Sequence, residues 1–105
     1  MQTIVFLGSE IKLKVEIEPI GGHSMDDFDF SCEFYCLGNQ PVLRTKVQME
    51  RSEDAGYIAL LDTRELGVGQ IRCKITGNIP DTYAGNDWVR TEVATIDTGV
   101  YITRG

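Results

Sequence analysis

The residues best suited to catalysis or metal binding lie in one polar stretch. His23 and Ser24 pair a base with a nucleophile, but neighbours in sequence need not face each other, and nothing fixes a third triad member. We expect a surface histidine. Asp26, Asp27 and Asp29 offer the hard oxygen ligands that calcium prefers. They lack the Asp/Asn ladder and central Gly of a calcium loop, so we expect a solvated face, with calcium as the alternative.

Other catalytic patterns are weak. Carboxylate pairs about 5–9 Å apart, as in glycosidases, are easily found on a sheet, but raising one pKa needs a cleft that a chain of 105 residues hardly supplies. Gly67-Val68-Gly69 precedes an expected strand and not a helix, so it does not resemble a phosphate loop. We therefore expect no enzymatic activity, no cofactor and no bound metal.

The three cysteines indicate a reducing compartment, because an odd count leaves at least one thiol unpaired. Cys32 and Cys36 lie in one expected strand, where their Cα atoms are about 13 Å apart. That separation is too large for a disulfide or a shared zinc ion. Cys73 could approach either one, so a single bridge stays geometrically possible. We expect all three to be small buried hydrophobic residues.

Composition indicates one soluble domain, residues 1–105. Lys plus Arg number 10 and Asp plus Glu 16, giving a net charge of −6 and a pI near 4.6. This acidic balance argues against nucleic acid and against an anionic membrane surface. The first residues have no basic segment, and their apolar run is shorter than the roughly 7–15 residues of a signal peptide. We expect a complete small protein made in the cytoplasm.

Hydrophobic residues alternate with polar ones along most of the chain, which is typical of strands with one buried and one solvated face. The residues expected inside are Ile11, Leu13, Val15 and Ile17, then Phe28, Phe30, Cys32, Phe34 and Cys36, then Leu43, Val47 and Met49, and finally Ile71, Cys73 and Ile75. Residues 57–61 form an apolar run that could be a more fully buried strand. No segment shows a sustained 3.6-residue period.

Turn and cap signals divide these strands. Asp62 and Thr63 could cap one helical turn that stops at Gly67. Residues 78–81 break the alternation, residues 88–96 read as another strand, and residues 97–99 as a turn before a last short strand. Seven or eight short strands with regular turns predict an all-β fold, an Ig-like antiparallel β-sandwich whose exact topology stays open.

The late strand, residues 88–96, is the expected contact surface, as an exposed edge strand whose free backbone N–H and C=O groups could pair with a neighbour. Trp88, Arg90 and Glu92 share one side of it, and aromatic residues and Arg are enriched at interfaces. Tyr83 precedes this strand, and Tyr35 is expected to point outward from its own. These five residues are the candidate interface. A sugar-stacking platform built from Trp88 and the tyrosines is the alternative.

Three sequence blocks carry a resemblance to phage proteins. Residues 59–71 (ALLDTRELGVGQI), Ile79-Pro80-Asp81 and residues 90–102 (RTEVATIDTGVYI) resemble recurring blocks in small proteins of tailed phages and prophages of gut bacteria. The whole chain also resembles the N-terminal Ig-like module of baseplate upper proteins and tail-fibre attachment proteins, although its early part matches only in strand rhythm. The resemblance implies a virion structural or adaptor role, in baseplate or tail attachment or in capsid decoration. It implies larger phage structural proteins or copies of this chain as partners.

Two other functions stay open. One is a carbohydrate-binding β-sandwich module, and the other is an accessory protein of a mobile element with a soluble partner. The neighbouring genes distinguish them: capsid and tail genes favour a virion protein made in the bacterial host cytoplasm, polysaccharide-uptake genes the sugar module, and conjugation genes the accessory protein.

Overall fold

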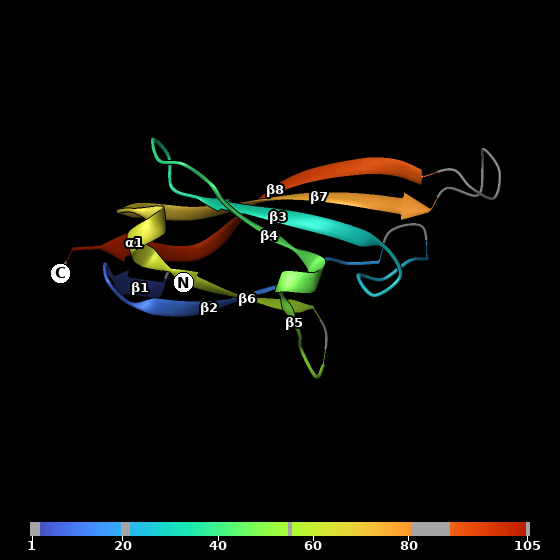
Figure 1. Ribbon diagram of the computed structural model, residues 1–105, viewed down its shortest axis with the longest axis horizontal. Coiled ribbons are helices and arrows are strands. Elements are labelled where there is room, and N and C mark those ends of the chain that lie inside the picture. The colour runs from blue at the N-terminus through green and yellow to red at the C-terminus, as the bar shows by residue number, and fades with distance from the viewer. Residues whose placement is uncertain (1–2, 20–21, 55, 81–88, 105) are drawn as a thin grey trace.

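The computed structural model describes residues 3–19, 22–54, 56–80 and 89–104, which form two packed β-sheets (Figure 1). The elements are β1 (Thr3–Phe6), β2 (Glu10–Val15), β3 (Asp29–Tyr35), β4 (Val42–Thr45), the 3₁₀ turn η1 (Lys46–Gln48), β5 (Glu50–Arg51), β6 (Tyr57–Asp62), α1 (Thr63–Leu66), β7 (Gly69–Pro80) and β8 (Val89–Thr103). One sheet has the order β1-β8-β7-β3-β4 and the other β2-β6-β5. The predicted all-β sandwich is confirmed.

The chain alternates between the sheets as in an immunoglobulin-like sandwich. It passes from β2 in the small sheet to β3 and β4 in the large one, returns for β5 and β6, and ends with β7 and β8 in the large sheet. In the immunoglobulin fold, strands B, E and D lie in one sheet and strands C, F and G in the other. Here β2, β6 and β5 take the places of B, E and D, and β3, β7 and β8 take those of C, F and G. The pairs are antiparallel apart from β1, which runs parallel to the end of β8. β7 and β8 are longer than expected, with 12 and 15 residues.

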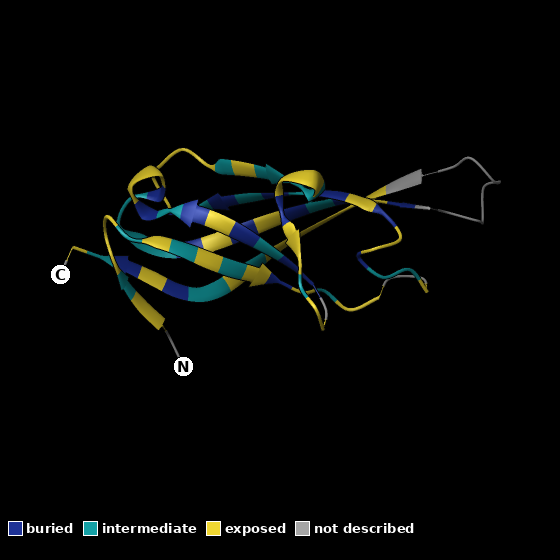
Figure 2. Cartoon of the chain, turned by 60° about the horizontal axis from the view of Figure 1, so that its bottom comes forward, coloured by how far each residue is buried: buried dark blue, intermediate teal, exposed yellow. Residues whose placement is uncertain are grey.

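The core lies between the sheets and follows the predicted alternation closely. On β2, Val15 is buried whereas Lys12 and Lys14 are exposed. The five residues expected inside between positions 28 and 36 are all buried, as are Ile71 and Cys73 on β7. Figure 2 shows this pattern as alternating dark and yellow bands along the strands. The sandwich is therefore built from strands with one apolar face, as their period of two dictates.

The prediction for β4 and the turn after it is wrong at two positions. Leu43 is 52% exposed and Val47 is 93% exposed, while only Met49 is buried. Leu43 lies opposite Glu33 of β3, on the solvent face of the large sheet. The 3₁₀ turn η1 then interrupts the period of two, so parity counted through it places Val47 on the wrong side. Along β6, Leu60 is also exposed, so this strand alternates and is not fully buried.

The expected turn at residues 97–99 is instead a bulge within β8. Gln70 pairs with Tyr101 and Arg72 with Asp97, so Ile71 alone faces residues 98–100. The Thr98 hydroxyl donates to the Ile71 carbonyl at 2.8 Å, which holds the bulge against β7. The break expected at residues 78–81 is also wrong for its described part, because β7 continues through residue 80.

The predicted helical turn is confirmed, and it anchors the connection between β1 and β2. Asp62 caps α1 by accepting from the Arg64 N–H at 2.9 Å, and Gly67 ends it with a φ of 82°. Thr63 is fully buried; its hydroxyl donates to the Ser9 carbonyl at 2.8 Å and accepts from the Gly8 N–H at 2.9 Å. In the described part of the chain, no helix has the length and apolar character to cross a membrane.

Candidate functional site

β8 has a neighbouring strand on both sides along only part of its length. β7 accompanies residues 89–102 of it, whereas β1 pairs only with residues 100–103. No described residue pairs with the other side of residues 89–97, a segment that we call the β8 edge. In Figure 1 it is the orange half of β8, along the top of the molecule. Backbone N–H and C=O groups on such an edge can pair with another strand.

The candidate interface residues are only partly located. Tyr83 and Trp88 lie outside the described residues. Arg90 belongs to the β8 edge, where its backbone pairs with Ile79, and Glu92 is exposed there opposite Gly77. Tyr35 is half-buried on β3 opposite Arg72, on the outer face of the same sheet. Residues paired across two strands point to the same face of the sheet, so Glu92 lies on the inner face with Gly77. Tyr35 lies on the outer face, and the structure therefore does not bring Tyr35 and Glu92 together.

The side chains along the β8 edge are largely exposed, which the alternation in the sequence predicted only in part. Residues 91–95 are all exposed, and Val93 is 55% exposed on the outer face. Thr91, Val93 and Thr95 share this face with the outward residues of β7. Alternation predicted their side of the strand, but not that the second sheet would leave this half of β8 uncovered.

An apolar hollow of about 240 Å³ lies beneath the β8 edge. Its lining residues are Ile17, Phe28, Ile75, Gly77, Ile79, Glu92, Val93 and Ala94. β2 ends at Val15, so the small sheet does not reach this end of β7 and β8. At its base Ile75, Gly77 and Ile79 of β7 are buried, whereas Glu92 and Ala94 of β8 are exposed, so the hollow is open on its β8 side.

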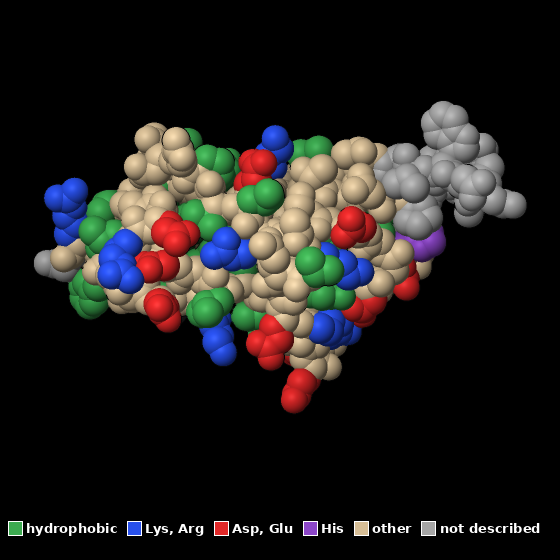
Figure 3. Space-filling model, in the orientation of Figure 1, with side chains coloured by type: hydrophobic (Ala, Val, Ile, Leu, Met, Phe, Trp, Pro, Cys, Tyr) green, Lys and Arg blue, Asp and Glu red, His purple; other side chains and the backbone are tan. Residues whose placement is uncertain are grey.

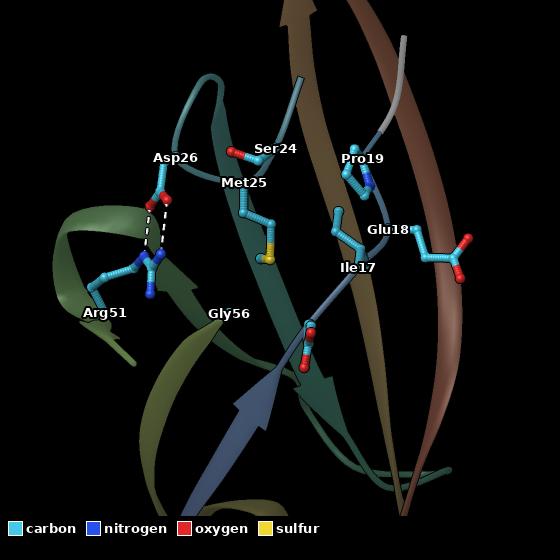
Figure 4. A pocket seen from close by; sticks show the side chains of 9 residues that line it. Ile17, Glu18, Pro19, Ser24, Met25, Asp26, Arg51 and Gly56 are labelled. Atoms are coloured by element: carbon cyan, nitrogen blue, oxygen red, sulfur yellow. Dashed lines mark hydrogen bonds and ion pairs between the residues drawn. The ribbon is translucent and has the colours of Figure 1, made fainter. Parts of the chain in front are cut away.

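A second, more polar hollow of about 440 Å³ lies next to the connection between β2 and β3 (Figure 4). In Figure 4, Asp26 and Arg51 are bonded to each other at one side of the hollow, and the Met25 side chain lies between this pair and Ile17. Glu16 and Glu18 also line this hollow, which makes it predominantly acidic. Its acidic side chains suit a cation or a basic group better than an anion.

Asp26 is held by three donors that sequence spacing did not reveal. Arg51 donates through Nε at 2.8 Å and through Nη2 at 3.0 Å, and the Tyr57 hydroxyl donates at 2.7 Å. The Arg51 guanidinium and then the Tyr57 hydroxyl lower the pKa of Asp26 to about 2. Lys46 donates to the Asp26 and Phe28 carbonyls at 3.1 and 2.9 Å. These bonds tie the loop before β3 to β5 and β6, a structural role.

The polar residues near His23 are arranged as a turn. Ser24 donates to the Asp27 carboxylate from its N–H at 3.0 Å and from its hydroxyl at 3.2 Å. Asp27 and Asp29 are exposed, as expected for a solvated face. Within the described residues, no group of three or more His, Cys, Asp or Glu side chains is placed to hold a metal ion.

The three thiols are free and buried, as predicted. The hydrogen bond with Cys32 and the burial of both side chains raise the pKa of Cys73 well above its usual value. Burial also raises the pKa of Cys36, whose thiol lies 3.6 Å from the Gly67 carbonyl. Reactive cysteines are accessible and acidic, so this environment suits inert packing residues.

The described tyrosines are divided between the core and the outer face of the large sheet. Tyr57 is buried, and its ring packs edge-on against Phe30 with centroids 5.0 Å apart. Tyr35 and Tyr101 lie on the outer face of the large sheet, on strands separated by β7.

Charged side chains of both signs are mixed over the face seen in Figure 3, with no large region of one sign.

The comparisons with known proteins assign no family. No family model, no curated protein and no solved structure matches the chain. What the structure itself defines is an all-β sandwich of two sheets, with the orders β1-β8-β7-β3-β4 and β2-β6-β5 in the described residues.

Proposed function

We propose that this chain is a non-catalytic structural or adaptor protein of a phage-type virion, acting through protein–protein contacts in baseplate or tail attachment or in capsid decoration. The observation that carries the proposal is the β8 edge, which has a neighbouring strand on one side only and lies beside an apolar hollow. Strand addition to such an edge supplies main-chain hydrogen bonds, and adjacent pockets select side chains.

Other features support a contact role over catalysis. Within the described residues, Ser24 is engaged by Asp27, and the thiols are buried. The resemblance of residues 59–71 and 90–102 to blocks of tailed-phage proteins supplies the virion context. The partners are larger structural proteins of the particle or further copies of this chain.

The test asks whether the chain is part of purified particles. Phage or prophage particles from a host carrying the gene are purified and analysed by mass spectrometry, using wild-type protein and the variants Val93→Lys and Val47→Lys. Both valines are exposed, so both variants are expected to fold, but only the first adds a charge to the β8 edge.

We expect wild-type and Val47→Lys protein in the particles and a loss of most Val93→Lys protein. Absence of the wild-type chain from particles whose genome carries its gene would overturn the proposal. Neighbouring genes for polysaccharide uptake or conjugation, instead of capsid and tail genes, would argue for a sugar-binding module or a mobile-element accessory protein.

A further inference from the structure

β1 forms one edge of the large sheet, and its composition differs from that of every other described strand. It pairs with β8 on one side, and within the described residues no strand pairs with its other side. It is the one described strand without a charged residue, and residues 3–7 also contain no Pro or Gly. Sheet edges are usually protected by charges or prolines, as here by the lysines of β2 and by Pro41 before β4. β1 is protected only by its length of 4 residues, which limits the number of bonds that a partner gains there.

The side chains of β1 form an exposed apolar surface on the outer face of the large sheet. Val5 pairs with the buried Ile102 and faces inward. Its neighbours Ile4 and Phe6 therefore face outward, where they are 63% and 59% exposed. Tyr101 lies beside Ile4 on the same face and is also exposed. Figure 2 shows β1, next to the N label, as a mostly exposed strand at the rim of the molecule. A partner at this edge therefore covers apolar side chains as well as backbone groups.

The backbone groups of Ile4 and Phe6 face away from β8. The Leu7 N–H donates to the Thr103 carbonyl at 2.7 Å, and successive residues of a strand direct their N–H and C=O groups to opposite sides. Alternate residues of β1 thus bond to β8, and the two between them present donors and acceptors to the free side. The Phe6 carbonyl accepts from the Ser9 N–H at 3.1 Å, and a carbonyl oxygen has a second lone pair for a further bond.

Two copies of β1 satisfy these groups in one antiparallel arrangement. With Val5 of each copy at the two-fold axis, Ile4 lies opposite Phe6 of the other copy, and these two residues exchange both main-chain bonds. The symmetry repeats this pair, so each outward backbone group of the strand has a partner. The outward side chains of the two copies then meet across the junction, with Tyr101 next in the row. Pairs centred on Ile4 or on Phe6 instead place one of these residues opposite a position outside β1.

We propose that β1 joins two copies of this chain into a symmetric dimer, with β1 antiparallel to β1 and Val5 at the two-fold axis. A second copy fits this edge because the occupant has to be extended, apolar and uncharged, and β1 is itself the described strand of that composition. The inference goes beyond the proposed function, since it uses a different edge and leaves the β8 edge open for a partner in the particle. The interface falls near the lower end of the size range, below about 1,200 Å², so micromolar dissociation is expected.

The experiment is analytical ultracentrifugation of the purified chain over a range of concentrations. The variants Ile4→Lys and Phe6→Lys each add a charge to the exposed edge. Two double variants test the register, because position 4 of one copy lies opposite position 6 of the other. Ile4→Lys/Phe6→Glu places opposite charges across the junction, whereas Ile4→Lys/Phe6→Lys places like charges there. Leu43→Lys is the matched control, since Leu43 is comparably exposed on β4, at the other edge of the same sheet. Circular dichroism and thermal unfolding verify that each variant is folded.

We expect the wild type and Leu43→Lys to dimerise and each single variant of β1 to weaken the dimer by roughly tenfold or more. The Lys/Glu double variant should dimerise about tenfold more tightly than the Lys/Lys variant. Amide exchange at Ile4 and Phe6 of the wild type should slow as the concentration rises.

A wild-type chain that stays monomeric at every concentration overturns the inference. So does a dimer that is as tight in both single variants as in the wild type, a pair of double variants that behave alike, or amide exchange at Ile4 and Phe6 that is independent of concentration.

The particle experiment separates this result from the proposed function. Val93→Lys should dimerise like the wild type, because residue 93 lies on the β8 edge and not on β1. A monomeric wild-type chain that enters particles refutes the dimer and retains the adaptor role. A dimer sensitive to Ile4→Lys and Phe6→Lys that never enters particles refutes the virion role and retains the dimer.

Discussion

Removing the Thr63 hydroxyl is expected to loosen the attachment of β1 to the sandwich. In Thr63→Val the shape of the buried side chain is nearly kept, but the bonds to the Ser9 carbonyl and the Gly8 N–H, 2.8 and 2.9 Å long, are lost. The Ser9 carbonyl still accepts from the Thr63 N–H at 3.0 Å, and Gly8 is exposed enough to reach water. Two bonds of about 1 kcal/mol each therefore predict a loss of about 2 kcal/mol.

The assay is urea unfolding at equilibrium, supported by thermal unfolding. For a domain of this size, about 2 kcal/mol corresponds to a fall in Tm of roughly 8–16 °C. Thr3→Val, on the exposed side of β1, is the control and should change stability by less than about 0.5 kcal/mol. Amide exchange at Leu7, whose N–H donates to the Thr103 carbonyl at 2.7 Å, should accelerate in Thr63→Val. Unchanged stability and unchanged exchange would refute the anchoring role.

Three further outcomes are expected. The pKa of Asp26 falls from 3.8 to about 2 on folding, so its ionised form favours the folded state above pH 4, and this contribution to stability is lost as the pH drops towards 2. The variant Asp26→Asn breaks the ion pair with Arg51. It should therefore flatten the curve of stability against pH between about pH 4 and pH 2. Gly56→Ala should be more destabilising in urea unfolding than Gly38→Ala, since both have positive φ but only at Gly56 would the new Cβ lie 2.5 Å from the Val15 carbonyl oxygen. The three buried thiols should react with a thiol reagent at the rate of unfolding in native buffer and at once in denaturant.

The parts of the fold that could be predicted depend on short-range pattern. The inward residues of β2 and β3 follow from a period of two. The helical turn α1 follows from the capping residues Asp62 and Thr63 at its beginning and from Gly67 at its end. The errors at Leu43 and Val47 have different causes. Leu43 lies on β4 opposite Glu33, on the solvent face, whereas parity counted beyond β4 fails at Val47 because η1 breaks the strand. The bulge at Thr98 depends on a bond to Ile71, which no spacing in the sequence indicates.

The site was anticipated as an edge strand that could pair with a partner, but not which part of that strand lies open. Alternation placed Glu92 and Val93 on opposite sides of a late strand, and this was correct. Whether that strand has one neighbour or two depends on where β1 pairs, and this is decided by the anchoring of the residues after β1 to Thr63, far along the chain. Similarly, the pairing of Asp26 with Arg51 joins a loop and a two-residue strand that carry no shared sequence signal.

The bulge gives the two halves of β8 different environments. Beyond it, β1 covers one side of residues 100–103, and Val100 and Ile102 are buried as part of the core. Before it, residues 91–95 stay paired with β7 but expose their side chains and their other edge. Because an irregularity increases local twist and interrupts a regular ladder, it favours ending the β1 pairing at residue 100 rather than extending it along the strand. The half of β8 that remains open is thus held in register by its pairing with β7, so its backbone is already extended for a further strand to bind.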